Sequence, residues 1–152
     1  MKRLLTLIPL LAASVFAQDP NTSMEVARKE MQTYGVEIVG AAMNLDPAIS
    51  DQFWSIYREY EVEREKIGDR KVALLREYIE ILENLSDEQA RDAAKRSFAI
   101  ERDLLSLKEK YYRIMEKELS ARVAARFVQV MNQIDSVVSS QLSREGPLIG
   151  GF

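Results

Sequence analysis

The stretch Leu85-Ser86-Asp87-Glu88-Gln89 decides the fold, because it lies between two long segments in which apolar residues recur at helical spacing. The Ser86 hydroxyl can accept a hydrogen bond from a backbone N–H two or three residues later, while the Gln89 side chain reaches back to the Ser86 N–H. Asp87 and Glu88 then lie in the first turn, where carboxylates interact favourably with the helix dipole. The stretch therefore predicts a capping box that starts a helix.

Two further joints have the same form, an apolar residue followed by a helix-capping residue. In Leu45-Asp46-Pro47, Asp46 is the expected N-cap and Pro47 takes the first helical position, where its missing N–H costs nothing. The third joint is Leu119-Ser120. No run of residues alternates with the period of two that strands show. The sequence predicts an all-α fold of four helices, at about 23–41, 47–84, 87–118 and 121–142.

The length of the second predicted helix predicts an elongated molecule. A helix over residues 47–84 would be about 57 Å long, whereas a compact domain of this size would be under about 40 Å across. The expected fold is therefore an elongated four-helix hairpin, resembling a coiled coil. Such a hairpin leaves part of its apolar seam uncovered, and a second copy related by a two-fold axis would cover it most simply.

The N-terminus has the features of a secretory signal peptide. Lys2 and Arg3 precede the mostly apolar run Leu4–Val15, and cleavage is expected after Ala17. The apolar run is shorter than the roughly 18 residues that a membrane-spanning helix needs. The predicted organisation is a signal peptide at 1–17, a flexible lead-in at 18–22, a single helical domain at 23–142 and a flexible tail at 143–152.

Composition restricts the possible chemistry. The chain has no histidine and no cysteine, which removes the commonest general base, the commonest transition-metal ligand and all disulfides. After residue 17 it carries 19 basic and 24 acidic residues, a net charge of −5 that disfavours nucleic-acid binding. Carboxylates could suggest a di-iron or manganese site, but such bundles use Glu-x-x-His pairs; the four considered are Glu59, Glu63, Glu77 and Glu80. We expect neither a cofactor nor an enzyme.

Other candidate sites have simpler interpretations. The thioethers of the methionines are possible copper ligands, but these residues lie mostly on apolar helix tracks, which favours core packing; they are Met24, Met31, Met43, Met115 and Met131. Ser97 and Lys95 could form a nucleophilic pair, but their spacing on a helix points the side chains apart. Gly150-Gly151 is not part of a phosphate-binding loop.

Aromatic residues near the start of the second helix allow two interpretations. They are Phe53, Trp54, Tyr57 and Tyr60. Core packing is one, and an exposed apolar strip able to hold unfolded chains or a partner helix is the other. Further along, Arg64 and Lys71 interrupt the apolar seam close to Gly68, so the middle of this helix is expected to bend or face solvent.

Together, the signal peptide, the four capped helices and the central joint resemble the Spy and CpxP family of periplasmic helical proteins. The family's mark is a Leu-Thr-x-x-Gln motif that often occurs twice. Here Leu85 and Gln89 are kept, with Ser86 in place of threonine, and Leu45-Asp46-Pro47-Ala48-Ile49 keeps the leucine and a capping residue without the glutamine. The resemblance covers about residues 24–142.

The resemblance implies a periplasmic, cradle-shaped antiparallel homodimer that acts as an ATP-independent chaperone for unfolded envelope proteins. The alternative is a regulator that docks on the periplasmic domain of a stress-sensor kinase. Related members sense heavy metals, which the missing histidine and cysteine disfavour here. The candidate surface for clients or partners combines the aromatic and basic residues Phe53, Trp54, Tyr57, Tyr60, Arg64, Arg70 and Lys71, with Lys66 and Arg76 adding to a local basic patch.

Overall fold

A computed structural model describes the backbone of residues 35–145 and the side chains of residues 35–137 and 140. Within this range every regular element is helical and no strand occurs, which confirms the all-α prediction. The predicted signal peptide 1–17, lead-in 18–22 and first part of the first helix lie outside the described residues, as does the tail from residue 146.

The chain divides into two units after Ile38. The described part of the first unit is residues 35–38, which are helical, and helical backbone continues in the second unit to residue 43. Asn44 then adopts a left-handed conformation with φ 44°, which asparagine tolerates better than most residues. Its N–H donates to the Gly40 carbonyl at 3.1 Å and closes the helix end.

Helix α2 (Pro47–Ile81) begins as predicted. The Ala48 N–H donates to the Asp46 carboxylate at 2.8 Å, and Pro47 takes the first helical position. The helix ends in a short 3-10 turn, η1 (Leu82–Asn84), before the next joint.

Helix α3 (Asp87–Glu118) begins with the predicted capping box. The Gln89 N–H donates to the Ser86 hydroxyl at 3.2 Å, and the Ser86 N–H donates to the Gln89 side-chain oxygen at 2.9 Å. These two contacts satisfy two backbone donors that a helix start otherwise leaves free.

Helix α4 (Ala121–Glu145) starts at the third predicted joint, where the Val123 N–H donates to the Ser120 hydroxyl at 3.2 Å. It continues past Leu142, so residues 143–145 are helical and the prediction that the tail begins at 143 is wrong. Helix α4 extends to Glu145 because no glycine or proline interrupts its helical pattern before Gly146.

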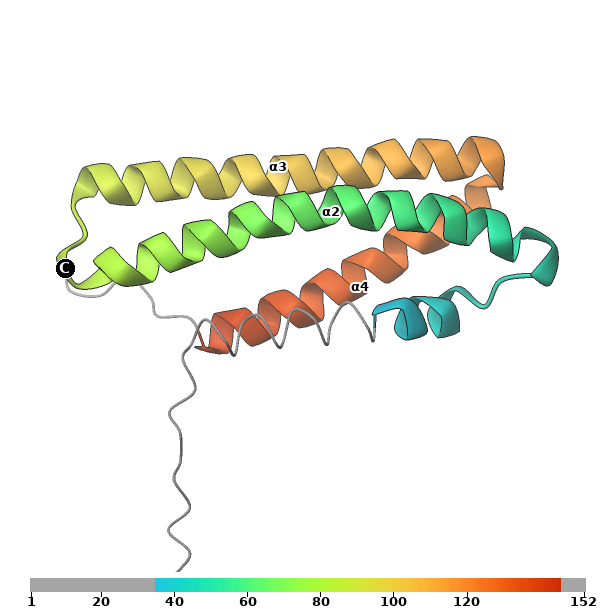
Figure 1. Ribbon diagram of the computed structural model, residues 1–152, viewed down its shortest axis with the longest axis horizontal. Helices are drawn as coiled ribbons and strands as arrows, with labels where there is room; N and C mark the ends of the chain where they lie inside the picture. The colour runs from blue at the N-terminus through green and yellow to red at the C-terminus, as the bar shows by residue number, and fades with distance from the viewer. Residues whose placement is uncertain (1–34, 146–152) are drawn as a thin grey trace, which may run out of the picture. The chain divides into compact units, whose positions relative to one another are not determined.

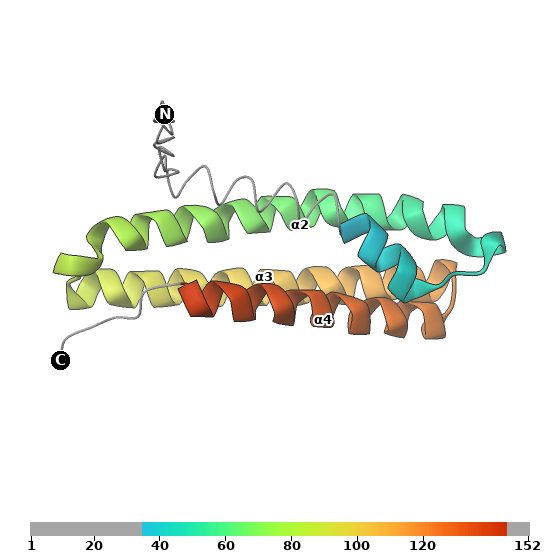
Figure 2. The same cartoon turned by 90° about the horizontal axis from the view of Figure 1, so that it is seen from below.

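Within the second unit, α2 and α3 lie side by side and run in opposite directions, and α4 returns along α3 (Figures 1 and 2). The three helices meet at an aromatic cluster. The ring of Tyr60 on α2 lies 5.4 Å from Tyr111 on α3 and 5.0 Å from Phe127 on α4, between centroids and nearly edge to face. This geometry adds a favourable ring–ring interaction to the burial of apolar area.

The most deeply buried side chains gather around this cluster, near the start of α2, the end of α3 and the start of α4. The largest of them are Tyr60, Tyr111, Phe53, Phe127, Met43, Met115 and Met131. Toward the η1 end of α2 the apolar residues are half-buried or, like Ile79, exposed. One end of the bundle therefore has a full core and the other does not.

Candidate functional site

Three of the four aromatic residues predicted as a client surface lie in the core. Phe53, Tyr57 and Tyr60 are 0%, 4% and 1% exposed. Trp54 is half-buried and meets Phe53 edge to face at 5.3 Å. The surface prediction is wrong for Phe53, Tyr57 and Tyr60, and the core interpretation is confirmed for them. Helix α4, distant in sequence, covers this face of α2, which the periodicity of one helix cannot reveal.

The basic residues of the predicted surface are also engaged within the chain. Arg70 pairs with Asp103 at 2.6 Å and Lys71 with Glu101 at 2.9 Å, both across to α3. Arg64 pairs with Asp135 on α4. The predicted basic patch is therefore wrong for these three residues, because carboxylates on neighbouring helices already neutralise them.

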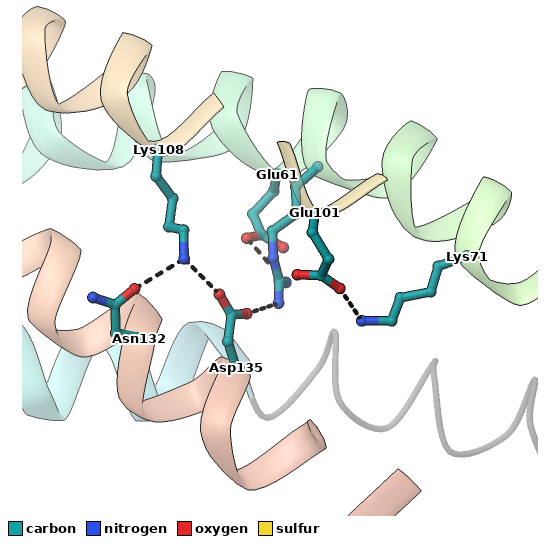
Figure 3. Close-up of polar contacts among 7 residues, drawn as sticks. Glu61, Lys71, Glu101, Lys108, Asn132 and Asp135 are labelled. Atoms are coloured by element: carbon teal, nitrogen blue, oxygen red, sulfur yellow. Dashed lines mark hydrogen bonds and ion pairs between the residues drawn. The ribbon is translucent and has the colours of Figure 1, made fainter. Parts of the chain in front are cut away.

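Around Asp135 a polar network joins α2, α3 and α4 (Figure 3). The Asp135 carboxylate accepts from the Arg64 guanidinium at 3.0 Å and from the Lys108 ammonium at 3.2 Å. Lys108 also donates to the side-chain oxygen of Asn132 at 2.9 Å. Arg64 faces α4 here and does not turn toward solvent. The expectation that α2 faces solvent at this residue is therefore wrong.

Glu61 lies next to this network, 3.6 Å from the Arg64 guanidinium. Burial raises the pKa of the Glu61 carboxyl above its ordinary value, and the positive charge of Arg64 only partly opposes this effect. Burial also raises the pKa of Tyr57 and of Tyr60. Burial thus disfavours the charged form of Glu61.

Three ion pairs between α2 and α3 form a ladder, which we call the charge ladder: Glu63 with Lys110, Arg70 with Asp103, and Glu77 with Arg96. On each helix the members are seven residues apart, and the sign of the charge alternates along it. Hydrogen bonds from Lys110 and Tyr111 lower the pKa of Glu63, and those from Arg96 lower the pKa of Glu77.

The carboxylates considered for a metal site are not brought together. Glu63 and Glu77 are both held in the charge ladder, 14 residues apart along α2. In the described range no group of three or more acidic residues is arranged to hold a metal ion. Met43, Met115 and Met131 are buried in the core, as the packing interpretation predicts, and Met24 and Met31 lie outside the described residues.

Several large apolar side chains are exposed instead. Phe98 and Leu105 on α3 are 64% and 56% exposed, and Ile79 and Val62 on α2 are 46% and 56% exposed. Exposed apolar patches can mark interaction sites. Exposed side chains such as these, and not the buried aromatics, are the apolar candidates that the described part of the fold offers to a partner.

An open groove of about 480 Å³ lies between the end of α2 and the start of α3. We call it the acidic groove. Its apolar lining comes from Leu74, Tyr78, Ile81 and Ala93, and its carboxylates are Glu77, Glu80, Glu88 and Asp92. Sequence reasoning did not identify this site. The crowding of acids on both sides of the central joint was the available signal.

No helix in the described part of the chain is long and apolar enough to cross a membrane. Comparisons of the chain with known protein families, with characterised proteins and with solved structures found no match. The resemblance to the Spy and CpxP family therefore stays a prediction.

Proposed function

We propose that the protein is an exported, ATP-independent, chaperone-like binding protein that holds partly unfolded polypeptides on its helical surface. The observation that carries the proposal is the exposure of large apolar side chains on two packed helices, above all Phe98 and Leu105 on α3 and Ile79 on α2. The absence of histidine and cysteine from the sequence also favours binding over catalysis.

The proposal includes the location and assembly that the family resemblance implies. The signal peptide would direct the chain to the periplasm, with cleavage after Ala17. The long antiparallel hairpin of α2 and α3 would pair with a second copy as a cradle-shaped homodimer. Mass measurement together with small-angle scattering tests the assembly, and a compact monomer would contradict it.

The test of function is suppression of aggregation. Purified residues 18–152 should keep a chemically denatured client soluble without nucleotide when present in several-fold molar excess. The variant Phe98→Ser/Leu105→Ser should lose most of this activity while keeping its helical circular dichroism, because both side chains are largely exposed. Ser106→Ala, on the same helix and also exposed, is the matched control. No suppression by the wild-type protein would refute the proposal.

A second candidate is a regulator that docks on one partner, such as the periplasmic domain of a sensor kinase. The acidic groove favours it, because a defined groove suits one partner helix better than many unrelated clients. A pull-down that returns a single stoichiometric partner, together with no effect on generic clients, would support this alternative.

A further inference from the structure

Among the described residues, only α2 and α3 lie at the end of the bundle that holds the acidic groove. Lys108 on α3 contacts Asn132 and Asp135, which sets the antiparallel alignment of α3 with α4. Helix α4 continues about ten residues beyond Asp135, so by the same alignment it ends opposite about Phe98. Within the described chain, roughly the first three turns of α3 extend past α4 with only α2 beside them.

The apolar residues at this end are consequently half-buried. The groove is lined by half-buried apolar side chains, among them Tyr78 and Ile81 on α2 and Ala93 on α3. The apolar side chains around Tyr60, in contrast, are buried where α4 covers them. Two helices alone cannot enclose an apolar seam. The groove is thus the place where the bundle would accept another helix.

Charge is concentrated at the same end. Residues 77–92 contain six acidic residues and one basic residue, a net charge of −5. The remainder of the chain after residue 17 contains 18 of each sign. The acidic character of the predicted mature protein therefore comes entirely from this short stretch. Arg96 neutralises Glu77, but no ion pair found among the described residues involves Glu80 or Glu88.

We propose that the acidic groove binds a helical polypeptide segment that has apolar side chains on one face and lysine or arginine along its edges. The apolar face would pack on Leu74, Tyr78 and Ile81, and the basic side chains would meet Glu80 and Glu88. This is recognition of an amphipathic helix in a groove, with charge complementarity setting the preference. It rests on the proposed binding function and specifies the class of segment that is held.

Fluorescence anisotropy tests the proposal with a labelled helical peptide of about 15 residues that has leucine on one face and lysine along both edges of that face. A matched peptide with glutamate in place of lysine is the reference. The purified protein should bind the lysine peptide at least about tenfold more tightly, and raising NaCl from about 50 mM to about 500 mM should reduce the difference. Equal binding of both peptides would overturn the proposal.

Variants then locate the site. Glu80→Gln/Glu88→Gln should weaken binding of the lysine peptide about three- to tenfold. Asp51→Asn/Glu118→Gln removes two exposed carboxylates outside the groove and should change the affinity less than about twofold. Equal losses in both variants would show an effect of net charge alone and would overturn the proposal. A change in oligomeric mass caused only by the groove variant would assign the groove to a second copy, and would also overturn it.

The client assay separates this proposal from the proposed function. If the protein suppresses aggregation but does not prefer the lysine peptide, the groove proposal fails and the chaperone-like function stands. If it prefers the lysine peptide through Glu80 and Glu88 but does not protect clients, the groove proposal stands and the chaperone-like function fails.

Discussion

Arg70 on α2 donates a hydrogen bond to Asp103 on α3, with 2.6 Å between Nη2 and Oδ2. This pair is the middle of the charge ladder, flanked seven residues away on each helix by a pair of the reversed sense, Glu63 with Lys110 and Glu77 with Arg96. Sliding one helix past the other by seven residues would place acid opposite acid and base opposite base. The ladder therefore favours one register of α2 against α3, in addition to whatever stability it supplies.

Reversing the charge of Asp103 should test the ladder. Asp103→Lys places a second cation opposite Arg70 and should lower the free energy of unfolding by about 1 kcal/mol, because both side chains are half exposed and solvent screens the pair. Adding Arg70→Glu should restore stability to within about 0.5 kcal/mol. Urea denaturation followed by circular dichroism measures both. Additive losses in the double variant would show that the two residues do not interact.

The network around Asp135 should contribute more than any single exposed pair. Asp135→Asn leaves Arg64 and Lys108 near each other without their shared carboxylate, and should lower the free energy of unfolding by about 1–2 kcal/mol. Arg113→Gln, which breaks a well-exposed pair with Glu109, should cost less than about 0.5 kcal/mol in the same urea titration. Equal losses of unfolding free energy in the two variants would show that the network around Asp135 contributes no more than a single exposed ion pair.

Phe127 and Phe98 should differ strongly in how much each side chain contributes to stability. Phe127→Ala empties part of the aromatic cluster and should cost about 3–5 kcal/mol, since its side chain is fully buried against Phe53 and Tyr60. Phe98→Ala should change stability by less than about 0.5 kcal/mol, because the residue is 64% exposed. Thermal or urea unfolding compares the two. A large loss for Phe98→Ala would show that this side chain is covered in solution.

The raised pKa of Glu61 predicts a specific dependence of stability on pH. The folded state binds the Glu61 proton more readily than the unfolded state, so this residue adds stability as the pH falls from neutral through its folded pKa toward the ordinary value of 4.5. Glu63 and Glu77 act in the opposite sense, because their lowered pKa values supply stability above 4.5 that is lost as the pH falls below it.

Urea titrations at several pH values between about 7 and 4 measure this dependence. Glu61→Gln should remove the gain in stability between neutral pH and 4.5, while Ser106→Ala, which changes no titratable group, should retain it. An unchanged profile in Glu61→Gln would assign the gain to another group.

The joints between helices show what residue type and spacing along the chain can predict. Asp46, Ser86 and Ser120 all cap helices, and each contacts a backbone N–H only two or three residues away. Because both partners lie in one short stretch, spacing and residue type suffice to identify them. The end of α4 at Glu145, three residues beyond the predicted limit, also has a local explanation, because Gly146 and Pro147 are the first residues after Ala121 that interrupt the helical pattern.

The aromatic residues show where local chemistry is insufficient. Phe53, Tyr57 and Tyr60 lie on an apolar face that the sequence allows to be either buried or exposed. Phe53 and Tyr60 are covered there by Phe127, which is 67 or more residues away. The basic residues Arg64, Arg70 and Lys71 resemble a free cationic patch only until their partners on α3 and α4 are known.

The sequence by itself determined the helical class, the three joints and most of the helix limits, because these depend on residue type and on neighbours within one turn. Only the tertiary structure decided which aromatic residues form the core, which charges are neutralised, and that Phe98, Leu105 and the acidic groove remain accessible. Those properties depend on which helix covers which face, and that is set by contacts between residues far apart in the chain.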